Sequence, residues 1–155
     1  MASVISAAAH KASQEADLSQ SFWQRAAELG ALDEQQRLDA IEQGWSSSWL
    51  AALRQHLHLK TADLEPLLAL SEATMARRSR EQAALDLVSS ERLDRLMEVL
   101  SLAYGVFEQP ASTEAWLKAP HPLLHQVSPL QHCRTAIGAG QVRRLLQALE
   151  HGAPV

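Results

Sequence analysis

The sequence predicts an all-α fold. Ala, Leu, Gln, Arg and Glu are abundant whereas Val and Ile are scarce, and this bias favours helices over strands. No stretch alternates between apolar and polar residues over the length of a strand bounded by turns. Ser, Thr, Gly and Pro instead recur at the spacing of short helices, at positions suited to begin and end them. With 155 residues, of which 46% are hydrophobic, the chain is long enough for one compact domain or two very small ones.

The first part of the chain is expected to form a flexible tail and then three helices. Residues 1–17, rich in Ala and polar side chains, are interpreted as the tail. Apolar residues at helical spacing, with capping residues before them, place helices at 19–30, closed by Gly30; at 33–43, closed by Gly44; and through 49–57, capped within Ser46, Ser47 and Ser48. Trp45, beside Gly44, is a candidate to face a partner.

A helix-turn-helix is predicted next. Thr61 is suited to cap a short helix that carries three leucines, with Pro66 inside its first turns. Ser71 is suited to cap a second helix over residues 72–81. Two short helices with a tight joint are typical of a helix-turn-helix, whose second helix reads DNA. The joint lacks the glycine that is frequent in this motif.

Four more helices are expected in the second half. An apolar stripe predicts a longer helix that begins at Ser89 and Ser90 and ends at Gly105. A short helix capped by Ser112 or Thr113 must stop before Pro120. The last two are expected after Ser128, with Pro129 in the first helical position and Gly138 just past the end, and over 141–150, with Gly152 beyond.

Charge is distributed unevenly along the chain, whose net charge is −4. Residues 1–43 have a net charge of −4 and residues 81–155 of −2, whereas residues 44–80, with five basic and three acidic side chains, have +2. The positive segment coincides with the predicted helix-turn-helix, which favours contact with DNA there. Because phosphate neutralisation supplies most of the affinity for DNA, one such segment is expected to bind weakly and an assembly of several more strongly.

Several classes of protein are disfavoured. No apolar run approaches the roughly 20 residues that cross a bilayer, and the first residues lack a signal-peptide pattern, so we expect a cytoplasmic protein without membrane contact. Cys133, the single cysteine, excludes an internal disulfide and is expected in the core. The seven histidines lack metal-ligand spacing, and no phosphate loop or nucleophile motif is present. We therefore expect neither a metal, a cofactor nor an enzymatic activity.

The most specific pattern lies between Trp116 and Gly152. It consists of Trp116-Leu117, the prolines at 120 and 122, the helix start Ser128-Pro-Leu, and a final helix framed by glycines. This succession resembles the C-terminal toxin-binding domain of the MbcA/ParS/Xre antitoxins, the partners of RES-domain toxins. One departure is Leu124-His-Gln-Val127, which stands where the family often has a glycine-containing turn.

The preceding region strengthens the resemblance. Leu70-Ser-Glu-Ala-Thr-Met-Ala-Arg-Arg78, together with the leucines before it, is similar to the Cro-type helix-turn-helix of Xre antitoxins. The resemblance covers residues 41–152. It implies a region of N-terminal helices and helix-turn-helix over 18–88, followed by a toxin-binding domain over 89–155.

The resemblance implies a function in two parts. The antitoxin binds a RES-domain toxin that consumes NAD and covers the entrance to its active site, so it acts by occlusion and not by chemistry. It forms a homodimer and higher-order assemblies with the toxin, and the complex represses its own operon by binding operator DNA. The alternative is a free-standing helix-turn-helix regulator whose C-terminal domain serves only for dimerisation.

Candidate site residues follow from these roles. The predicted DNA contacts, against the alternative of caps and a solvated basic face, are Ser71, Thr74, Arg77, Arg78 and Arg80. The predicted toxin contacts, against the alternative of a solvated helix face, are Arg143, Arg144, Gln147, Glu150, His151 and Val155. Glu150 or the terminal carboxylate of Val155 is suited to occupy a phosphate-binding pocket as an anion; alternatively, Arg143 and Arg144 pair with acidic groups at its rim.

Overall fold

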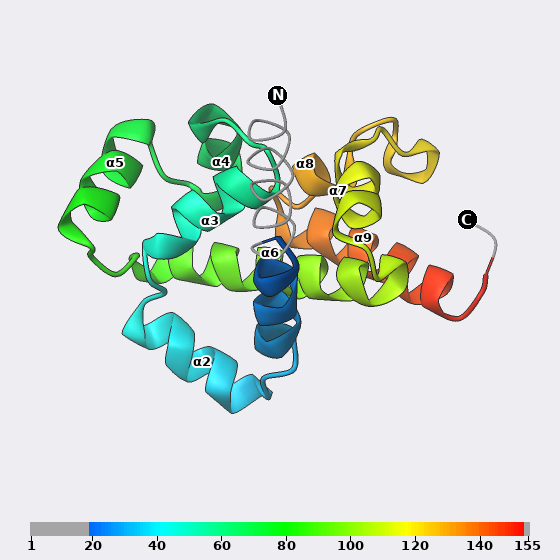
Figure 1. Ribbon diagram of the computed structural model, residues 1–155, viewed down its shortest axis with the longest axis horizontal. Helices are drawn as coiled ribbons and strands as arrows, with labels where there is room; N and C mark the ends of the chain where they lie inside the picture. The colour runs from blue at the N-terminus through cyan, green and yellow to red at the C-terminus, as the bar shows by residue number, and fades with distance from the viewer. Residues whose placement is uncertain (1–18, 154–155) are drawn as a thin grey trace, which may run out of the picture.

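The computed structural model describes residues 19–153, and in this range the chain is all-α (Figure 1). Residues 19–30 are helical, and the only extended pairings in the described range are two isolated bridges, Ser46 with Ala84 and His121 with Val127. The later elements are α2 (Glu34–Gln43), α3 (Ser48–His56), α4 (Thr61–Leu68), α5 (Glu72–Glu81), α6 (Leu87–Phe107), α7 (Pro110–Lys118), the 3-10 turn η1 (Pro122–Leu124), α8 (Pro129–His132) and α9 (Ala136–Glu150). Within residues 19–153, no helix has the length and apolar character needed to cross a membrane.

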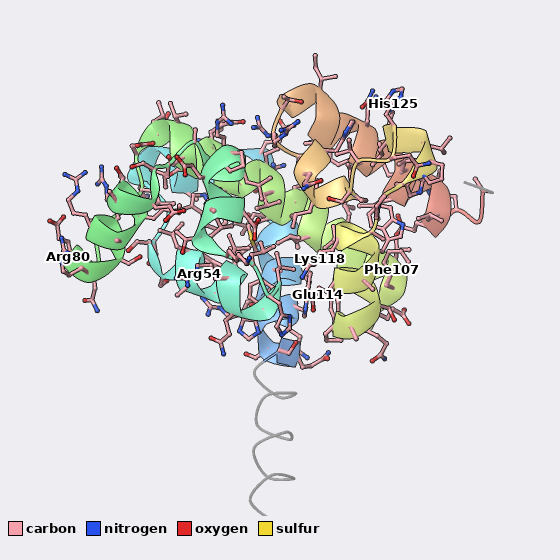
Figure 2. The ribbon with its side chains drawn as sticks, turned by 90° about the horizontal axis from the view of Figure 1, so that it is seen from above. Arg54, Arg80, Phe107, Glu114, Lys118 and His125 are labelled. Atoms are coloured by element: carbon pink, nitrogen blue, oxygen red, sulfur yellow. The ribbon has the colours of Figure 1, made fainter. Side chains whose placement is uncertain are left out.

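All other elements are arranged around α6. In Figure 1 this helix runs along the long axis of the molecule, with α2 below its first half, α3 and α4 above it, and α7 and α9 along its second half. Viewed from above, Arg80 of α5 and His125, just after η1, lie at opposite ends of the molecule (Figure 2). Helices from both halves of the chain, α2 and α4 from the first and α7 and α9 from the second, therefore pack on one common helix.

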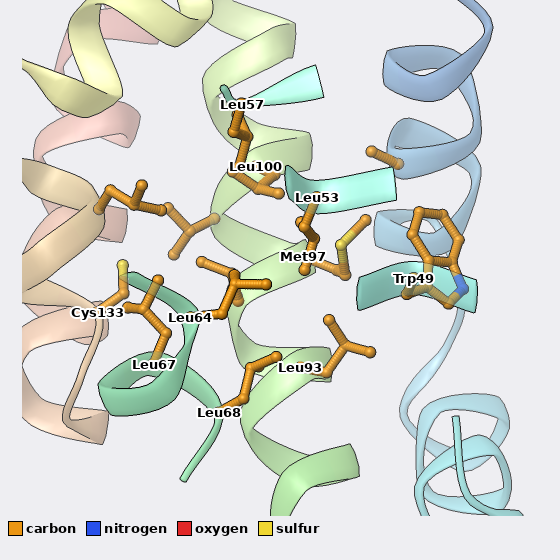
Figure 3. Close-up of a cluster of buried hydrophobic side chains, with 14 of the residues drawn as sticks. Trp49, Leu53, Leu57, Leu64, Leu67, Leu68, Leu93, Met97, Leu100 and Cys133 are labelled. Atoms are coloured by element: carbon orange, nitrogen blue, oxygen red, sulfur yellow. The ribbon is translucent and has the colours of Figure 1, made fainter. Parts of the chain in front are cut away.

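The buried side chains form one continuous core. Figure 3 shows Leu93, Met97 and Leu100 of α6 meeting leucines of α3 and α4, with Cys133 at the edge of the group. Trp45, which the sequence suggested for a partner surface, is 6% exposed and packs edge-on against Trp49, so that interpretation is wrong. Cys133 is buried as expected; its Sγ donates to the carbonyl of Pro129, and burial raises the pKa of the thiol to about 12.

Several predicted helix boundaries are confirmed. The side chain of Asp33 accepts from the backbone N–H of Gln36, and Gly44, with φ of 88°, follows the end of α2 in the left-handed region that favours glycine. Ser71 and Ser128 cap α5 and α8 as predicted, each by accepting a backbone N–H three residues later.

Three of the predicted caps are wrong, and a fourth lacks its side-chain bond. Ser47 is the residue before α3, within the predicted caps, but its Oγ donates to the carbonyl of Arg78, and Ser46 Oγ accepts from the N–H of Ser48. Lys60 precedes α4, with Asp63 accepting its N–H, so Thr61 is already helical. The helix α6 begins at Leu87 with Asp86 as cap and runs through Gly105 to Phe107, and α7 begins at Pro110, earlier than Ser112 and Thr113.

Two glycines allow close packing between elements. Gly30 is the last helical residue of 19–30, and a Cβ there would lie 2.1 Å from Ser101 Oγ of α6. Gly138, predicted to lie past a helix end, is inside α9, which begins at Ala136 with Thr135 as cap. A Cβ at Gly138 would lie 1.9 Å from the carbonyl oxygen of His132, so glycine is needed for α9 to approach the end of α8.

The turn after η1 has an unusual backbone. His125 and Gln126, with φ of 55° and 63°, both adopt the left-handed region, although neither is glycine. The turn is closed by the N–H of Gln126, which donates to the carbonyl of His121, and by the N–H of His121, which donates to that of Val127. The segment Leu124–Val127 thus has a glycine-like conformation without glycine.

Two glycine substitutions should have opposite effects on stability. We expect Gly138→Ala to lower the free energy of unfolding by about 1–3 kcal/mol, because the added methyl group overlaps a backbone carbonyl. Gly105→Ala should raise it by about 0.5–1 kcal/mol, because this residue is inside α6 and no atom lies within 4 Å of the added Cβ. Urea unfolding followed by circular dichroism measures both, and an unchanged midpoint for Gly138→Ala would contradict the packing argument.

Candidate functional site

The helices α4 and α5 form the helix-turn-helix, and the joint works without glycine. Ala69 adopts the left-handed conformation, with φ of 52°, and supplies the turn that glycine commonly makes. Leu70 is buried after it, and Ser71 begins α5. Met75 is the only residue of α5 that is buried, so most of this helix faces solvent. In this arrangement α5 is an exposed helix at one end of the molecule (Figure 1).

The three predicted arginines of α5 have different environments. Arg77 and Arg80 are exposed, and Figure 2 shows Arg80 at the outer edge of the molecule. Arg78 is half-buried, and its guanidinium donates to the carbonyl of Ala84 at 2.9 Å. Its own carbonyl accepts from Ser47 Oγ at 3.1 Å. Arg78 therefore fixes the segment between α5 and α6 against α3, whereas Arg77 and Arg80 are available to an external anion.

The polar residues at the start of α5 bond to each other. Ser71 Oγ accepts from the N–H of Thr74 at 3.2 Å and donates to Thr74 Oγ1 at 2.9 Å. Both hydroxyls retain acceptor capacity, but their first role is to hold the helix start.

Arg54, near the end of α3, was not among the predicted site residues. It is exposed, and a hollow of about 180 Å³ joins it to Thr61 and to the α5 residues Glu72, Ala76 and Ser79. Arg54 thus adds a cation beside the exposed side of α5. The signal in the sequence was its position inside the one positively charged segment, outside the recognition helix itself.

The helix α9 has an inner and an outer side. Ala139, Val142 and Leu146 are buried, while four of the predicted contact residues are exposed, namely Arg144, Gln147, Glu150 and His151. The predicted contact Val155 lies outside the described residues. Arg143 is turned inward, and its guanidinium donates to Glu98 Oε2 of α6 at 2.6 Å.

Ile137 is the functional candidate that the sequence analysis missed. It is 78% exposed in the first turn of α9 and lies on the same side as Gln141 and Arg144, which follow it by four and seven residues. A hollow of about 360 Å³ lies beside it, lined mainly by residues of the joint between α8 and α9. The sequence analysis predicted a helix start at 141, whereas α9 begins at Ala136, and this error hid the position of Ile137 on the outer side of the helix.

A network of four charged side chains connects three helices. The guanidinium of Arg37, on α2, donates to Asp94 at 2.7 Å and to Glu98 Oε2 at 3.2 Å. Glu98 Oε2 also accepts from Arg143 of α9, so one carboxylate oxygen is shared by two arginines. Hydrogen bonding to Asp94 raises the pKa of Arg37, and the Asp94 side chain is 9% exposed. The network joins α2 and α9 through α6.

No metal centre emerges among residues 19–153, because no three His, Cys, Asp or Glu side chains there are arranged to hold an ion. A hollow of about 400 Å³ lies between α4, α7 and α8 and is lined by side chains of both charge signs, including Asp63, Lys118 and Arg134. Lys118 at its edge donates to the carbonyl of Leu57 and to Glu114, so its ammonium group already holds α7 against the end of α3.

Comparison with known proteins gives two consecutive family matches. Residues 36–98 match the antitoxin Xre-like helix-turn-helix domain, and residues 102–152 match the antitoxin Xre/MbcA/ParS C-terminal toxin-binding domain. The chain is similar to the antitoxin Xre of Pseudomonas putida KT2440, with 25% identity over 112 residues that cover 72% of this chain and 69% of that protein. It is also similar to the Prs ADP-ribosylating antitoxin of Sphingobium sp. YBL2, with 25% identity over 126 residues that cover 76% of this chain and 79% of that protein.

The charge network predicts unequal effects of its two arginines. Arg37→Gln should lower the free energy of unfolding by about 2 kcal/mol, because it leaves the nearly buried carboxylate of Asp94 without its cation. Arg143→Gln should lower the free energy of unfolding by less than about 1 kcal/mol, because both partners of that ion pair are partly solvated. Urea unfolding measures both. As a control, the double variant Arg37→Gln with Asp94→Asn should be more stable to urea than Arg37→Gln alone. If the double variant is no more stable, the loss of stability does not come from the unpaired carboxylate of Asp94.

Proposed function

Because the chain belongs to the Xre-type antitoxins, with a helix-turn-helix domain and a C-terminal toxin-binding domain, we propose that its partner is a RES-domain toxin that degrades NAD. In this proposal the antitoxin neutralises the toxin by covering its active site. The complex of the two also represses its own operon. The observation that carries the proposal is the outer side of α9, which the core leaves exposed inside the matched toxin-binding domain.

The relative from Sphingobium supports an NAD-consuming partner. Its name connects it to ADP-ribosylation, and ADP-ribose is transferred from NAD. A toxin that binds NAD has to accommodate the charge of two phosphates. A basic pocket suited to phosphates is also suited to a carboxylate, such as that of Glu150, which is exposed at the end of α9.

The packing of α9 supports the proposal that the antitoxin covers the active site of the toxin. The inner side of the helix is packed on α6, and Arg143 is paired with Glu98, so a docked toxin meets a helix that is already ordered. Binding to a preformed surface avoids the loss of conformational entropy that a folding segment would incur. We assign Ile137 as the apolar contact and Arg144, Gln147, Glu150 and His151 as the polar contacts.

Operator binding is assigned to the exposed cations around α5. Arg77 and Arg80 on α5 and Arg54 on α3 are placed to contact phosphates or base edges, with the start of α5 at Ser71 and Thr74 nearest to the bases. Arg78 is used internally, so the proposal gives it a positioning role.

A negative charge on the outer side of α9 should weaken toxin binding. We expect Arg144→Glu, which reverses a charge, and Ile137→Glu, which replaces an apolar contact, each to raise the Kd for the RES-type toxin at least tenfold, which corresponds to about 1.4 kcal/mol, without lowering the melting temperature. Isothermal titration with a catalytically inactive toxin measures Kd, and growth and cellular NAD after toxin induction report neutralisation. Gln55→Glu on α3 is the control. A chain that fails to bind the toxin at all, yet binds DNA, would instead favour the free-standing regulator.

Removing a cation from α5 should weaken DNA binding without affecting the fold. Arg77→Ala and Arg80→Ala should each lower affinity for the promoter DNA and reduce the slope of log K against log salt by about 1, because one phosphate contact is lost. Fluorescence anisotropy at several salt concentrations measures this. Arg144→Ala, equally exposed on α9, should leave the slope unchanged. Arg78→Ala should lower the melting temperature. Equal slopes for all four variants and the unmodified chain would contradict the proposal that α5 contacts DNA.

A further inference from the structure

The turn from His121 to Val127 combines an exposed leucine with an unusual backbone. Leu124 anchors the turn, since its side chain is 1% exposed, whereas the neighbouring Leu123 is 59% exposed. His125 and Gln126 are exposed as well. The core therefore holds one residue of the turn and leaves three side chains around it in contact with solvent.

The backbone of this turn differs from the other left-handed positions in residues 19–153. Single non-glycine residues with positive φ stand at the ends of four helices, which is a common way for a helix to end: His58, Ala69, Gln82 and Glu108. His125 and Gln126 instead follow each other, with φ of 55° and 63°. Because side chains are strained in this region and normally enter it one residue at a time, glycine would be favoured at both positions. Residues that keep such a conformation without being glycine are candidates for a role in binding.

Hydrogen bonds hold the turn in one conformation. The carbonyl of His121 accepts from the N–H groups of Leu124 and Gln126, both at 3.0 Å, and its Nδ1 accepts from the N–H of Leu123 at 3.2 Å. The N–H of Val127 donates to the carbonyl of Leu124 at 3.0 Å. A partner would therefore meet an ordered surface, which loses little conformational entropy on binding.

The surface around the turn lacks formally charged side chains. Residues 119–133 form the longest stretch of the chain without Asp, Glu, Lys or Arg. Seven of these fifteen residues are nevertheless exposed. Exposed surface without charge is typical of the centre of a protein–protein interface, where charged side chains are depleted.

The position of the turn distinguishes between the two expected partners. It lies within residues 102–152, the part matched by the toxin-binding family, and Figure 2 shows His125 at the opposite end of the molecule from Arg80 of α5. Contacts to DNA phosphates need Lys or Arg, and the turn has neither. An apolar side chain among neutral polar ones instead fits a protein partner, and the matched domain is one that binds a toxin.

We infer that Leu123, His125 and Gln126 form a second contact with the toxin, separate from the outer side of α9. Leu123 enters an apolar recess of the toxin, and His125 and Gln126 make hydrogen bonds at the edge of that recess. The left-handed backbone sets the direction of these two side chains, so the contact is retained at a cost in stability. The inference rests on the proposed binding of a toxin, and it adds residues that distinguish one toxin from another.

The first test compares two glutamines that share one backbone conformation. Gln126→Gly and Gln82→Gly each replace an exposed glutamine in the left-handed region, at φ of 63° and 51°. Both should raise the melting temperature by about 2 °C, because glycine relieves the strain. Only Gln126→Gly should raise the Kd for a catalytically inactive toxin, by at least fivefold. Circular dichroism measures the melting temperature, and isothermal titration measures Kd.

The outcomes of this comparison separate the inference from the proposed function. An unchanged Kd for Gln126→Gly would overturn the inference, and so would a lowered melting temperature, which would show that the side chain stabilises the turn. An equal rise in Kd for Gln82→Gly would overturn it as well, because the effect would then not be specific to the turn. If the unmodified chain does not bind the toxin, the proposed function itself fails and the inference fails with it.

The second test removes the exposed leucine. Leu123→Ser should raise the Kd for the inactive toxin at least tenfold without lowering the melting temperature, because most of this side chain lies outside the core. Leu38→Ser is the matched control, since Leu38 is 53% exposed on α2, outside the matched toxin-binding domain, and it should leave Kd unchanged. A Leu123→Ser variant that binds the toxin as tightly as the unmodified chain would show that the turn is not contacted.

Discussion

The structure depends on the burial of α6 on several sides at once. Its buried apolar side chains belong to one core that also holds leucines of α3 and α4 and the α9 residues Val142 and Leu146; they include Leu93, Met97, Val99, Leu100 and Ala103. A helix buried around most of its circumference cannot shift against one partner without disturbing the others, because protein cores are close-packed. The two family matches meet between residues 98 and 102, inside this helix, so the boundary between two functions falls where the backbone is continuous.

The charge network adds orientation to this packing. Apolar contacts are non-directional, whereas the guanidinium of Arg37 reaches both oxygens of Asp94 and therefore sets the angle at which α2 crosses α6. Arg143 does the same for α9 through Glu98. The sharing of one oxygen of Glu98 by two arginines means that the positions of α2 and α9 are specified by the same carboxylate. It also explains why Arg143 has a different environment from Arg144, although the two are adjacent in sequence.

Sequence patterns predicted the fold class and most helices because spacing and caps are local properties. Asp33 with Gly44, and Ser71 with α5, were placed correctly, since the capping side chain and the helix lie within a few residues of each other. The errors arose where a residue type is used for tertiary contact. Gly138 looked like a helix end, but the carbonyl of His132 makes glycine necessary there, and Ser90 looked like a cap, but its Oγ accepts from the N–H of Trp45. Exposure of Ile137 and burial of Arg78 also depend on packing between distant segments, which no local pattern contains.

Because the helices share one core, the two proposed binding surfaces are held in a fixed arrangement. The helix α9 packs on α6, and α5 packs on α4, which also packs on α6, so the fold and not a linker would set the direction of a bound toxin relative to bound DNA. If a flexible linker joined the two binding surfaces, a bound toxin would not fix the position of α5 and would affect DNA affinity only through its own charge. Here the toxin would sit at a fixed angle, and any toxin that contacts two antitoxin chains would hold their α5 helices at a defined spacing. The spacing of recognition helices decides whether two half-sites are contacted together, so in the proposed complex a bound toxin would alter the avidity for DNA without any change in the shape of the antitoxin.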